Sequence, residues 1–156
     1  MQLFFASSNR DKIKELQNIL AKEQLPLQLF TLLDHPEWEM EIEENGQTYA
    51  ENALLKAQAY QKLTNLPILA DDSGLEVDVL PGLLGVYTNR WHPGDAKEKN
   101  LALLKKLGDE KNRCCHYNCT LCLLEKGRAP IFFVGLCQGQ IADQISHEYG
   151  FGYDPI

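Results

Sequence analysis

The sequence contains no long hydrophobic run and no block of basic residues. No apolar stretch approaches the length that a bilayer-spanning helix needs, and residues 1–6 are too short, and lack the basic leader, for a signal peptide. The net charge is −7, from 15 basic and 22 acidic residues, so a basic face for nucleic acid is not expected. We therefore expect a protein that binds neither membranes nor nucleic acids.

A second cysteine pair and the common catalytic motifs are also missing. The five cysteines are odd in number and clustered late, which indicates reduced thiols and a cytoplasmic setting. Cys119 and Cys122 have the spacing of a metal or redox pair, but both fall in an expected strand, where residues three apart face opposite sides. We expect free, buried thiols. The histidines show no recurrent spacing from an acid and a nucleophile, and no Walker loop or dinucleotide fingerprint occurs.

The remaining pattern predicts one α/β domain. The chain has 156 residues and is 44% hydrophobic, enough for a sizeable core. Strands are expected at 3–7, 25–33, 66–69, 75–80, 113–124 and 131–136, and helices at 10–22, at 48–63 and between Asp95 and Gly108. Strands and helices alternate early and a hairpin-like pair of strands comes late, so we expect a mixed central sheet flanked by helices.

The stretch Asp71-Asp72-Ser73-Gly74 is the first candidate site. It follows the short apolar run 66–69. Two acids, a hydroxyl and a glycine are unfavourable residues for extending a hydrophobic core. At the rim of a sheet the same residues would present carboxylates to a metal ion or a phosphate ester. The alternative is an ordinary polar turn, since Asp, Ser and Gly are common turn formers.

The segment from Ser7 to Lys12 is the second candidate, because a strand leads there through small polar residues into a helix. The free N–H groups and the dipole of a helix N-terminus favour an anion, and Lys12 adds a charge. Ordinary capping by Asn9 with a solvated lysine explains the pattern equally well. Lys56 lies off the apolar stripe of helix 48–63, so it either reaches a ligand or faces solvent. The acidic stretch from Glu37 to Glu44 is expected to be mostly a solvated loop, with one or two carboxylates available to a metal.

Five short motifs occur in order along the chain. They are Ser7-x-Asn9-x-x-Lys12, Glu51-Asn52-Ala53 with Lys56, Ala70-Asp71-Asp72-Ser73-Gly74-Leu75, Gly82-x-x-Gly85-x-Tyr87 with Arg90, and Gly150-Phe151-Gly152-Tyr153-Asp154-Pro155. Their order and spacing resemble the Ham1/RdgB-like inosine triphosphate pyrophosphatase family, from the first strand to the last residue. The resemblance implies a Ham1/ITPase-like architecture, related to the Maf fold.

The resemblance also implies an activity. Members of this family hydrolyse non-standard purine nucleoside triphosphates (ITP, dITP and XTP) to the monophosphate and pyrophosphate, and so cleanse the nucleotide pool. They use Mg²⁺ and are usually homodimers. We therefore expect a Mg²⁺-dependent enzyme whose partners are a small-molecule purine nucleoside triphosphate and a second copy of the chain.

Roles for individual residues follow from the same resemblance. Asp72 corresponds to the proton acceptor and a metal-site residue, and the acid two or three residues before Gly46, taken as Glu43, to the second metal carboxylate. Lys56 would touch phosphate, and Ser73 would contact the substrate. The triphosphate turn would comprise Ser7, Ser8, Asn9, Arg10, Asp11 and Lys12. The base and sugar would be lined by Phe151, Gly152, Tyr153 and Asp154.

The chain departs from the family pattern at two places. Tyr87-Thr88-Asn89-Arg90 stands where Tyr-Ser-Ala-Arg is usual, and the sequence ends at Ile156, before the family's C-terminal segment with its lysine and Ser-His-Arg motif. We expect residues 1–156 to form one pyrophosphatase domain without that segment. A second hypothesis is a truncated nucleotide-binding homologue with weak or no turnover. A third is a metal-dependent phosphatase that releases orthophosphate.

Overall fold

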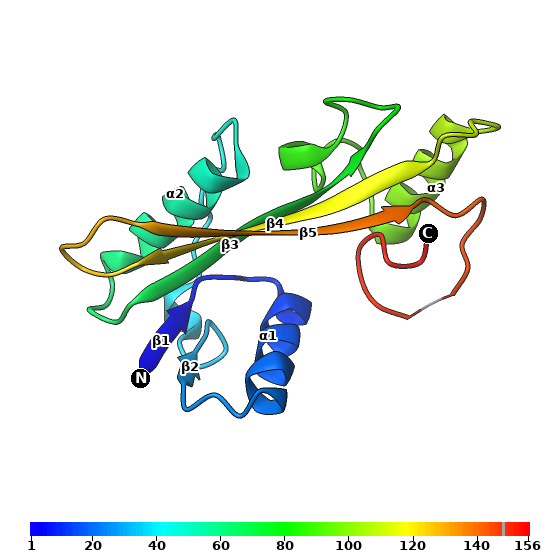
Figure 1. The fold of residues 1–156 in the computed structure, drawn as a ribbon. Coiled ribbons are helices and arrows are strands. Elements are labelled where there is room, and N and C mark those ends of the chain that lie inside the picture. The colour runs from blue at the N-terminus through cyan, green and yellow to red at the C-terminus, as the bar shows by residue number, and fades with distance from the viewer. Residues whose placement is uncertain (148) are drawn as a thin grey trace. The chain divides into compact units, whose positions relative to one another are not determined.

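The computed structural model describes residues 1–147 and 149–156 (Figure 1). Its strands form one five-stranded sheet in the order β2-β1-β3-β4-β5. The strands are β1 (Gln2–Phe5), β2 (Gln28–Phe30), β3 (Ile68–Val77), β4 (Cys114–Leu124) and β5 (Ile131–Gln140), and the helices are α1 (Arg10–Lys22), α2 (Tyr49–Gln61) and α3 (Ala96–Leu107), with 3-10 turns η1 (Pro36–Trp38) and η2 (Gly85–Tyr87). The expected α/β fold with a mixed sheet is confirmed.

The chain divides into two compact units. Unit 1 comprises residues 1–72 and 120–134, and unit 2 comprises residues 73–119 and 135–156. Strands β3, β4 and β5 each contribute residues to both units. The prediction of a single domain stays a prediction.

Unit 1 is built on a parallel β1-α1-β2 motif. β1 pairs in parallel with β2, Leu3 opposite Leu29, and also with β3, Phe4 opposite Ile68. Apolar side chains from β1, β3, β4 and α2 form one buried core, in which Phe4, Ala53 and Ile68 are fully buried. A parallel strand in the middle of a sheet is covered on both faces, which explains why β1 reads as a continuous apolar run.

Both helices of unit 1 begin at the residues that the sequence predicts. Asn9 caps α1, and its side chain accepts hydrogen bonds from the N–H groups of Asp11 and Lys12. Thr48 and Glu51 form a complete capping box at the start of α2. These local contacts satisfy backbone donors that the first helical turn leaves without a partner.

One expectation about β3 is wrong. The sequence indicated a strand at 66–69, a polar turn or rim at 71–74 and a second strand at 75–80, whereas one continuous strand runs from Ile68 to Val77. Gly74 makes this possible, because a Cβ there would collide with the carbonyl oxygen of Gly85. The strand therefore continues where turn-forming residues suggested that it would end, and the two aspartates lie within the strand.

The acidic stretch 37–44 is not simply a solvated loop. Trp38 and Ile42 pack against the core of unit 1. The Trp38 ring lies 5.1 Å from Phe4 and is stacked on His35 at 4.1 Å between ring centroids. Burial of these rings is favourable because aromatic side chains remove a large apolar area from water. The segment is thereby held against β1 instead of being free in solvent.

Unit 2 has its own core, built from the second half of β3, α3 and residues near the C-terminus. Leu75, Val77, Leu103 and Leu107 are buried together there. α3 begins at the predicted cap, where Asp95 and Glu98 form a capping box, and ends at Gly108 with a positive φ of 49°. None of the helices within the described residues is both long and apolar enough to cross a membrane.

All five cysteines are free thiols, as expected, but only one of them is buried. Cys122 is fully buried, while Cys114, Cys115 and Cys119 are partly exposed and Cys137 is exposed on β5. Burial raises the pKa of the Cys122 thiol to about 11. The expectation of uniformly buried thiols is therefore wrong for β5, whose residues are all exposed.

These differences predict the order in which the thiols react. With iodoacetamide at neutral pH, the partly exposed Cys114 should be alkylated within the native protein, whereas Cys122 should be alkylated only on unfolding, because it is enclosed and its thiolate is disfavoured. Peptide mass spectrometry over a urea series measures both rates. Equal rates for Cys122 and Cys114 in native protein would contradict the burial of Cys122.

Candidate active site

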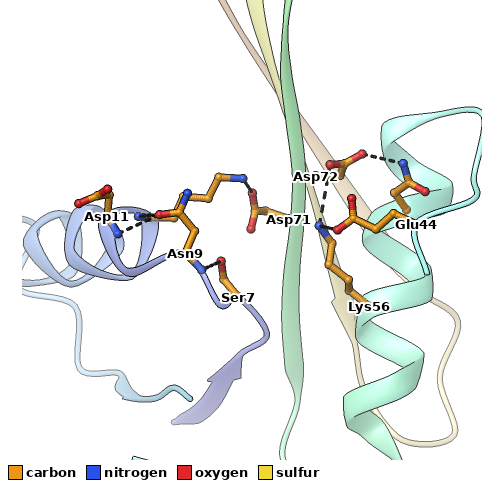
Figure 2. A network of polar contacts seen from close by, with 9 residues as sticks. Ser7, Asn9, Asp11, Glu44, Lys56, Asp71 and Asp72 are labelled. Atoms are coloured by element: carbon orange, nitrogen blue, oxygen red, sulfur yellow. Dashed lines mark hydrogen bonds and ion pairs between the residues drawn. The ribbon is translucent and has the colours of Figure 1, made fainter. Parts of the chain in front are cut away.

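Two adjacent carboxylates on β3 organise the polar residues of unit 1. Successive side chains of a strand point to opposite faces, so Asp71 and Asp72 project in opposite directions. Figure 2 shows Asp71 directed toward α1 and Asp72 directed toward α2. Asp71 is 3% exposed and Asp72 is 6% exposed. Two nearly buried charges of the same sign need compensating partners, and each face of the strand supplies one.

On the first face, Asp71 holds Lys12. The distance between Lys12 Nζ and Asp71 Oδ2 is 2.5 Å. Lys12 lies in the first turn of α1, which Asn9 caps. The hydroxyl of Ser7 accepts a hydrogen bond of 3.3 Å from the N–H of Asn9. The ion pair therefore fixes the helix N-terminus and its lysine beside the strand, in the arrangement that favours anion binding.

The other residues of the predicted triphosphate turn lie at the surface. Ser8, Asn9, Arg10 and Asp11 are exposed, whereas Ser7 is buried. The N–H of Asp11 donates to Asn9 Oδ1 at 2.9 Å. Their exposure is compatible with contact to a ligand, and their roles in substrate binding stay predictions.

On the second face, Asp72 belongs to a cluster with residues of α2 and the loop before it (Figure 2). Lys56 Nζ lies 3.0 Å from Glu44 Oε1 and 3.8 Å from Asp72 Oδ1. Asn52 Nδ2 donates a hydrogen bond of 3.0 Å to Asp72 Oδ2. Lys56 thus faces the carboxylates and not bulk solvent, and its contact with phosphate stays a prediction.

Burial dominates the electrostatics of Asp72. It raises the pKa of this carboxyl group above its usual value, and the nearby Glu44 raises it further. The charge of Lys56, the hydrogen bond from Asn52 and the charge of Lys12 act in the opposite direction. A carboxylate whose ionised form is disfavoured by burial is a stronger proton acceptor once it is ionised, which suits a general base.

Glu44, rather than Glu43, contacts this cluster. Glu43 is exposed, whereas Glu44 is partly buried and pairs with Lys56. Both acids satisfied the spacing before Gly46 that the sequence suggested. The role of Glu43 as a metal carboxylate stays a prediction, but the observed contacts favour its neighbour.

The other predicted site residues, Ser73 and residues 151–154, belong to unit 2. Ser73 is 7% exposed. Asp154 Oδ2 accepts a hydrogen bond of 2.9 Å from the N–H of Phe151, and this contact closes the turn at 151–154. Tyr153 is buried, and its hydroxyl accepts a hydrogen bond of 2.6 Å from Trp91 Nε1. Phe151 and Gly152 are partly exposed.

From the sequence, Asp71 has a role only as part of the acidic stretch 71–74, and Asn52 has none, although both lie in the predicted motifs. Strand alternation would have separated Asp71 from Asp72, had 68–77 been recognised as one strand. Asn52 interrupts an otherwise apolar helix face near the N-terminus of α2, where a polar side chain needs a partner. This polar residue on an apolar helix face is the sequence feature that could have identified Asn52 as part of the site.

The cluster on the second face offers a donor set for a divalent cation. Glu44 and Asp72 supply carboxylate oxygens that both approach Lys56 Nζ. No group of three or more His, Cys, Asp or Glu residues suited to a metal occurs among residues 1–147 and 149–156. Two carboxylates nevertheless suit Mg²⁺, which is often held by one or two carboxylates together with substrate phosphates and water.

Proteins named dITP/XTP pyrophosphatase are similar to this chain over nearly its whole length. The chain is 41% identical over 159 residues to the dITP/XTP pyrophosphatase of Listeria innocua, covering 99% of this chain and 77% of the relative. It is 41% identical over 158 residues to the dITP/XTP pyrophosphatase of an Exiguobacterium species, covering all of this chain and 79% of that protein.

Solved structures are also similar to this chain over its whole length. The HAM1 protein of Coxiella burnetii superimposes with a TM-score of 0.84 at 34% identity, and the Ham1 protein of Staphylococcus aureus with a TM-score of 0.83 at 33% identity; each comparison covers all of this chain and 80% of the other. The sequence model of the Ham1 family matches residues 3–156. The chain therefore belongs to the Ham1 family.

Proposed function

We propose that this protein hydrolyses non-canonical purine nucleoside triphosphates, dITP and XTP (and, by the same chemistry, ITP), to the nucleoside monophosphate and pyrophosphate. The names of its relatives point to these substrates. The observation that carries the proposal is the pair of lysines held by carboxylates on the two faces of β3. Such a set combines cations for phosphates with an acceptor for the proton of water.

The reaction needs a water molecule that attacks the α-phosphorus as the bond to the β-phosphate oxygen breaks. Asp72 orients this water and accepts its proton, and pyrophosphate leaves with the bonding electrons. Lys12 and Lys56 stabilise the negative charge that develops on the phosphate oxygens. Asp71 contributes by holding Lys12 at the N-terminus of α1. For Ser73 and residues 151–154, contacts to the substrate stay predictions.

Magnesium fits this chemistry. Glu44 and Asp72 would hold the ion, since both carboxylates approach the same ammonium group, that of Lys56. When bound, Mg²⁺ would neutralise phosphate charge and so lower the barrier to the departure of pyrophosphate.

We further propose that the protein is a cytoplasmic homodimer. β5 lies at the edge of the sheet and is exposed along its whole length. Its exposed apolar side chains are Ile131, Phe132, Phe133, Val134 and Leu136. An apolar edge strand of this kind is normally covered, and a second copy of the chain is the occupant that we propose.

Turnover of dITP, XTP and dATP with Mg²⁺ at mildly alkaline pH tests the proposed reaction. We expect pyrophosphate from dITP and XTP and little from dATP, with pyrophosphate and orthophosphate assayed separately. Asp72→Asn should lower turnover by at least about 100-fold because the proton acceptor is lost. Orthophosphate as the first product would indicate a phosphatase, and tight dITP binding without turnover would indicate a nucleotide-binding homologue. Either result would overturn the proposal.

The neighbouring acids Glu43 and Glu44 provide a matched pair for the magnesium site. Glu44→Gln should lower turnover by at least about tenfold and raise the Mg²⁺ concentration needed for half-maximal rate, because a charged ligand is removed. Glu43→Gln should stay close to wild type. Magnesium titrations of dITP hydrolysis by both variants measure this difference, and the reverse pattern would assign the site to Glu43.

Light scattering coupled to size-exclusion chromatography tests the dimer. We expect a mass near twice the 17.7 kDa of the chain. Phe133→Glu should shift the mass toward the monomer, since it places a charge in the proposed contact. Leu25→Glu alters an exposed apolar residue away from β5 and should leave the mass unchanged. A wild-type monomer at micromolar concentration would contradict the dimer.

A further inference from the structure

Asn52 is a fully buried polar residue that the mechanism above does not use. It lies in the first part of α2, and its exposed fraction is 0%. An amide that is removed from water costs free energy unless its donors and acceptor find partners. Its neighbours on the buried face of the helix are small or apolar, Ala53 and Ala57 among them. Packing alone therefore does not explain why a polar side chain occupies this position.

Both ends of the Asn52 amide are engaged. Its Oδ1 accepts a hydrogen bond of 2.8 Å from the N–H of Gly46, and its Nδ2 donates one of 3.0 Å to Asp72 Oδ2. A backbone N–H can only donate and an ionised carboxylate can only accept, so the amide satisfies both partners in a single orientation. Rotating the amide by half a turn would place its NH₂ group against an N–H and its oxygen against a carboxylate.

The loop before α2 holds the amide in place. A Cβ at Gly46 would lie 2.6 Å from Asn52 Oδ1, so only glycine allows the loop backbone to approach this closely. The loop is anchored in turn by Glu51, whose Oε2 accepts from the N–H of Gln47 at 2.6 Å and from that of Thr48 at 3.2 Å. The beginning of α2 and its loop thus form a support for one side chain, Asn52.

We infer that Asn52 is a positioning residue for Asp72, held in its orientation by the Gly46 N–H. Asn52 fixes Oδ2 of Asp72, while Lys56 approaches Oδ1. The carboxylate therefore has a defined orientation on β3. An amide provides this orientation as a neutral donor, without introducing a second cation beside the base. Because a reacting group must be held close to its productive geometry, loss of this donor should impair the chemical step more than substrate binding.

This inference rests on the proposed function, in which Asp72 accepts the proton of water. The first variant is Asn52→Leu, which keeps a similar volume and removes the donor to Asp72. The second is Gly46→Ala, which retains Asn52 but displaces its amide. With dITP and saturating Mg²⁺, we expect both variants to lower kcat by about 10- to 100-fold, the range found when supporting hydrogen bonds around a site are removed, with KM within about threefold of wild type.

A control for general destabilisation is Thr31→Val at the end of β2. Thr31 is 1% exposed, and its hydroxyl donates to Asp34 Oδ2 at 3.0 Å and accepts from the N–H of Leu33 at 3.1 Å. This variant also loses part-buried hydrogen bonds in unit 1, but it leaves Asp72 untouched. Its unfolding free energy should fall while kcat and KM stay near wild type. If Asn52→Leu does not fold, Gly46→Ala still tests the inference.

The outcomes separate this inference from the proposed function. A wild-type kcat for Asn52→Leu or for folded Gly46→Ala, beside an inactive Asp72→Asn, would overturn the role of Asn52 and leave the proposed base intact. A raised KM with unchanged kcat would overturn it as well, because it would indicate a contact with substrate. If kcat falls as much for Thr31→Val as for Asn52→Leu, general loss of stability would explain both results, and the positioning role of Asn52 would be overturned. Wild-type turnover by Asp72→Asn would overturn the base, and the inference with it.

Discussion

The polar organisation of unit 1 depends on the alternation of a single strand. Because consecutive side chains of β3 point to opposite faces, two adjacent aspartates serve two different helices. Asp71 forms an ion pair with Lys12 at the start of α1. Asp72 lies near Lys56 and accepts a hydrogen bond from Asn52, both in α2. A turn at this position would have released both carboxylates into solvent. Continuity of the strand instead keeps them nearly buried, where each must be compensated by a partner on its own side.

The burial of these charges also explains how the cluster is supported. An isolated ion pair at a protein surface contributes little to stability, about 0–1 kcal/mol. The contacts here are different, since the partners come from helices whose first turns are capped by side chains, Asn9 in α1 and the Thr48–Glu51 capping box in α2. The positions of the charged groups therefore do not depend only on their attraction to one another. Local backbone chemistry in α1 and α2 has already placed them, which reduces the conformational entropy lost on forming the cluster.

Features that depend on near neighbours could be predicted from the sequence. The caps at Asn9, Thr48 and Asp95 are examples, because each is a contact within three residues along the chain. The continuity of β3 could not be predicted, since Ser73 and Gly74 favour turns and only the close approach of the Gly85 backbone explains the glycine. The choice between Glu43 and Glu44 was also out of reach, because a loop has no periodicity to show which side chain faces inward. The role of Asn52 required knowledge of Gly46 and Asp72 as spatial neighbours.

The environment of Trp38 has a consequence for observing the molecule. The chain contains two tryptophans, and one lies in each compact unit: Trp38 in unit 1 and Trp91 in unit 2. Trp38 is stacked on His35, whereas Trp91 donates a hydrogen bond to Tyr153. The two indoles thus occupy chemically distinct surroundings, and indole emission responds to its surroundings. Replacing either one by phenylalanine would leave a single intrinsic fluorophore, so that the opening of each unit could be followed separately by its own optical signal.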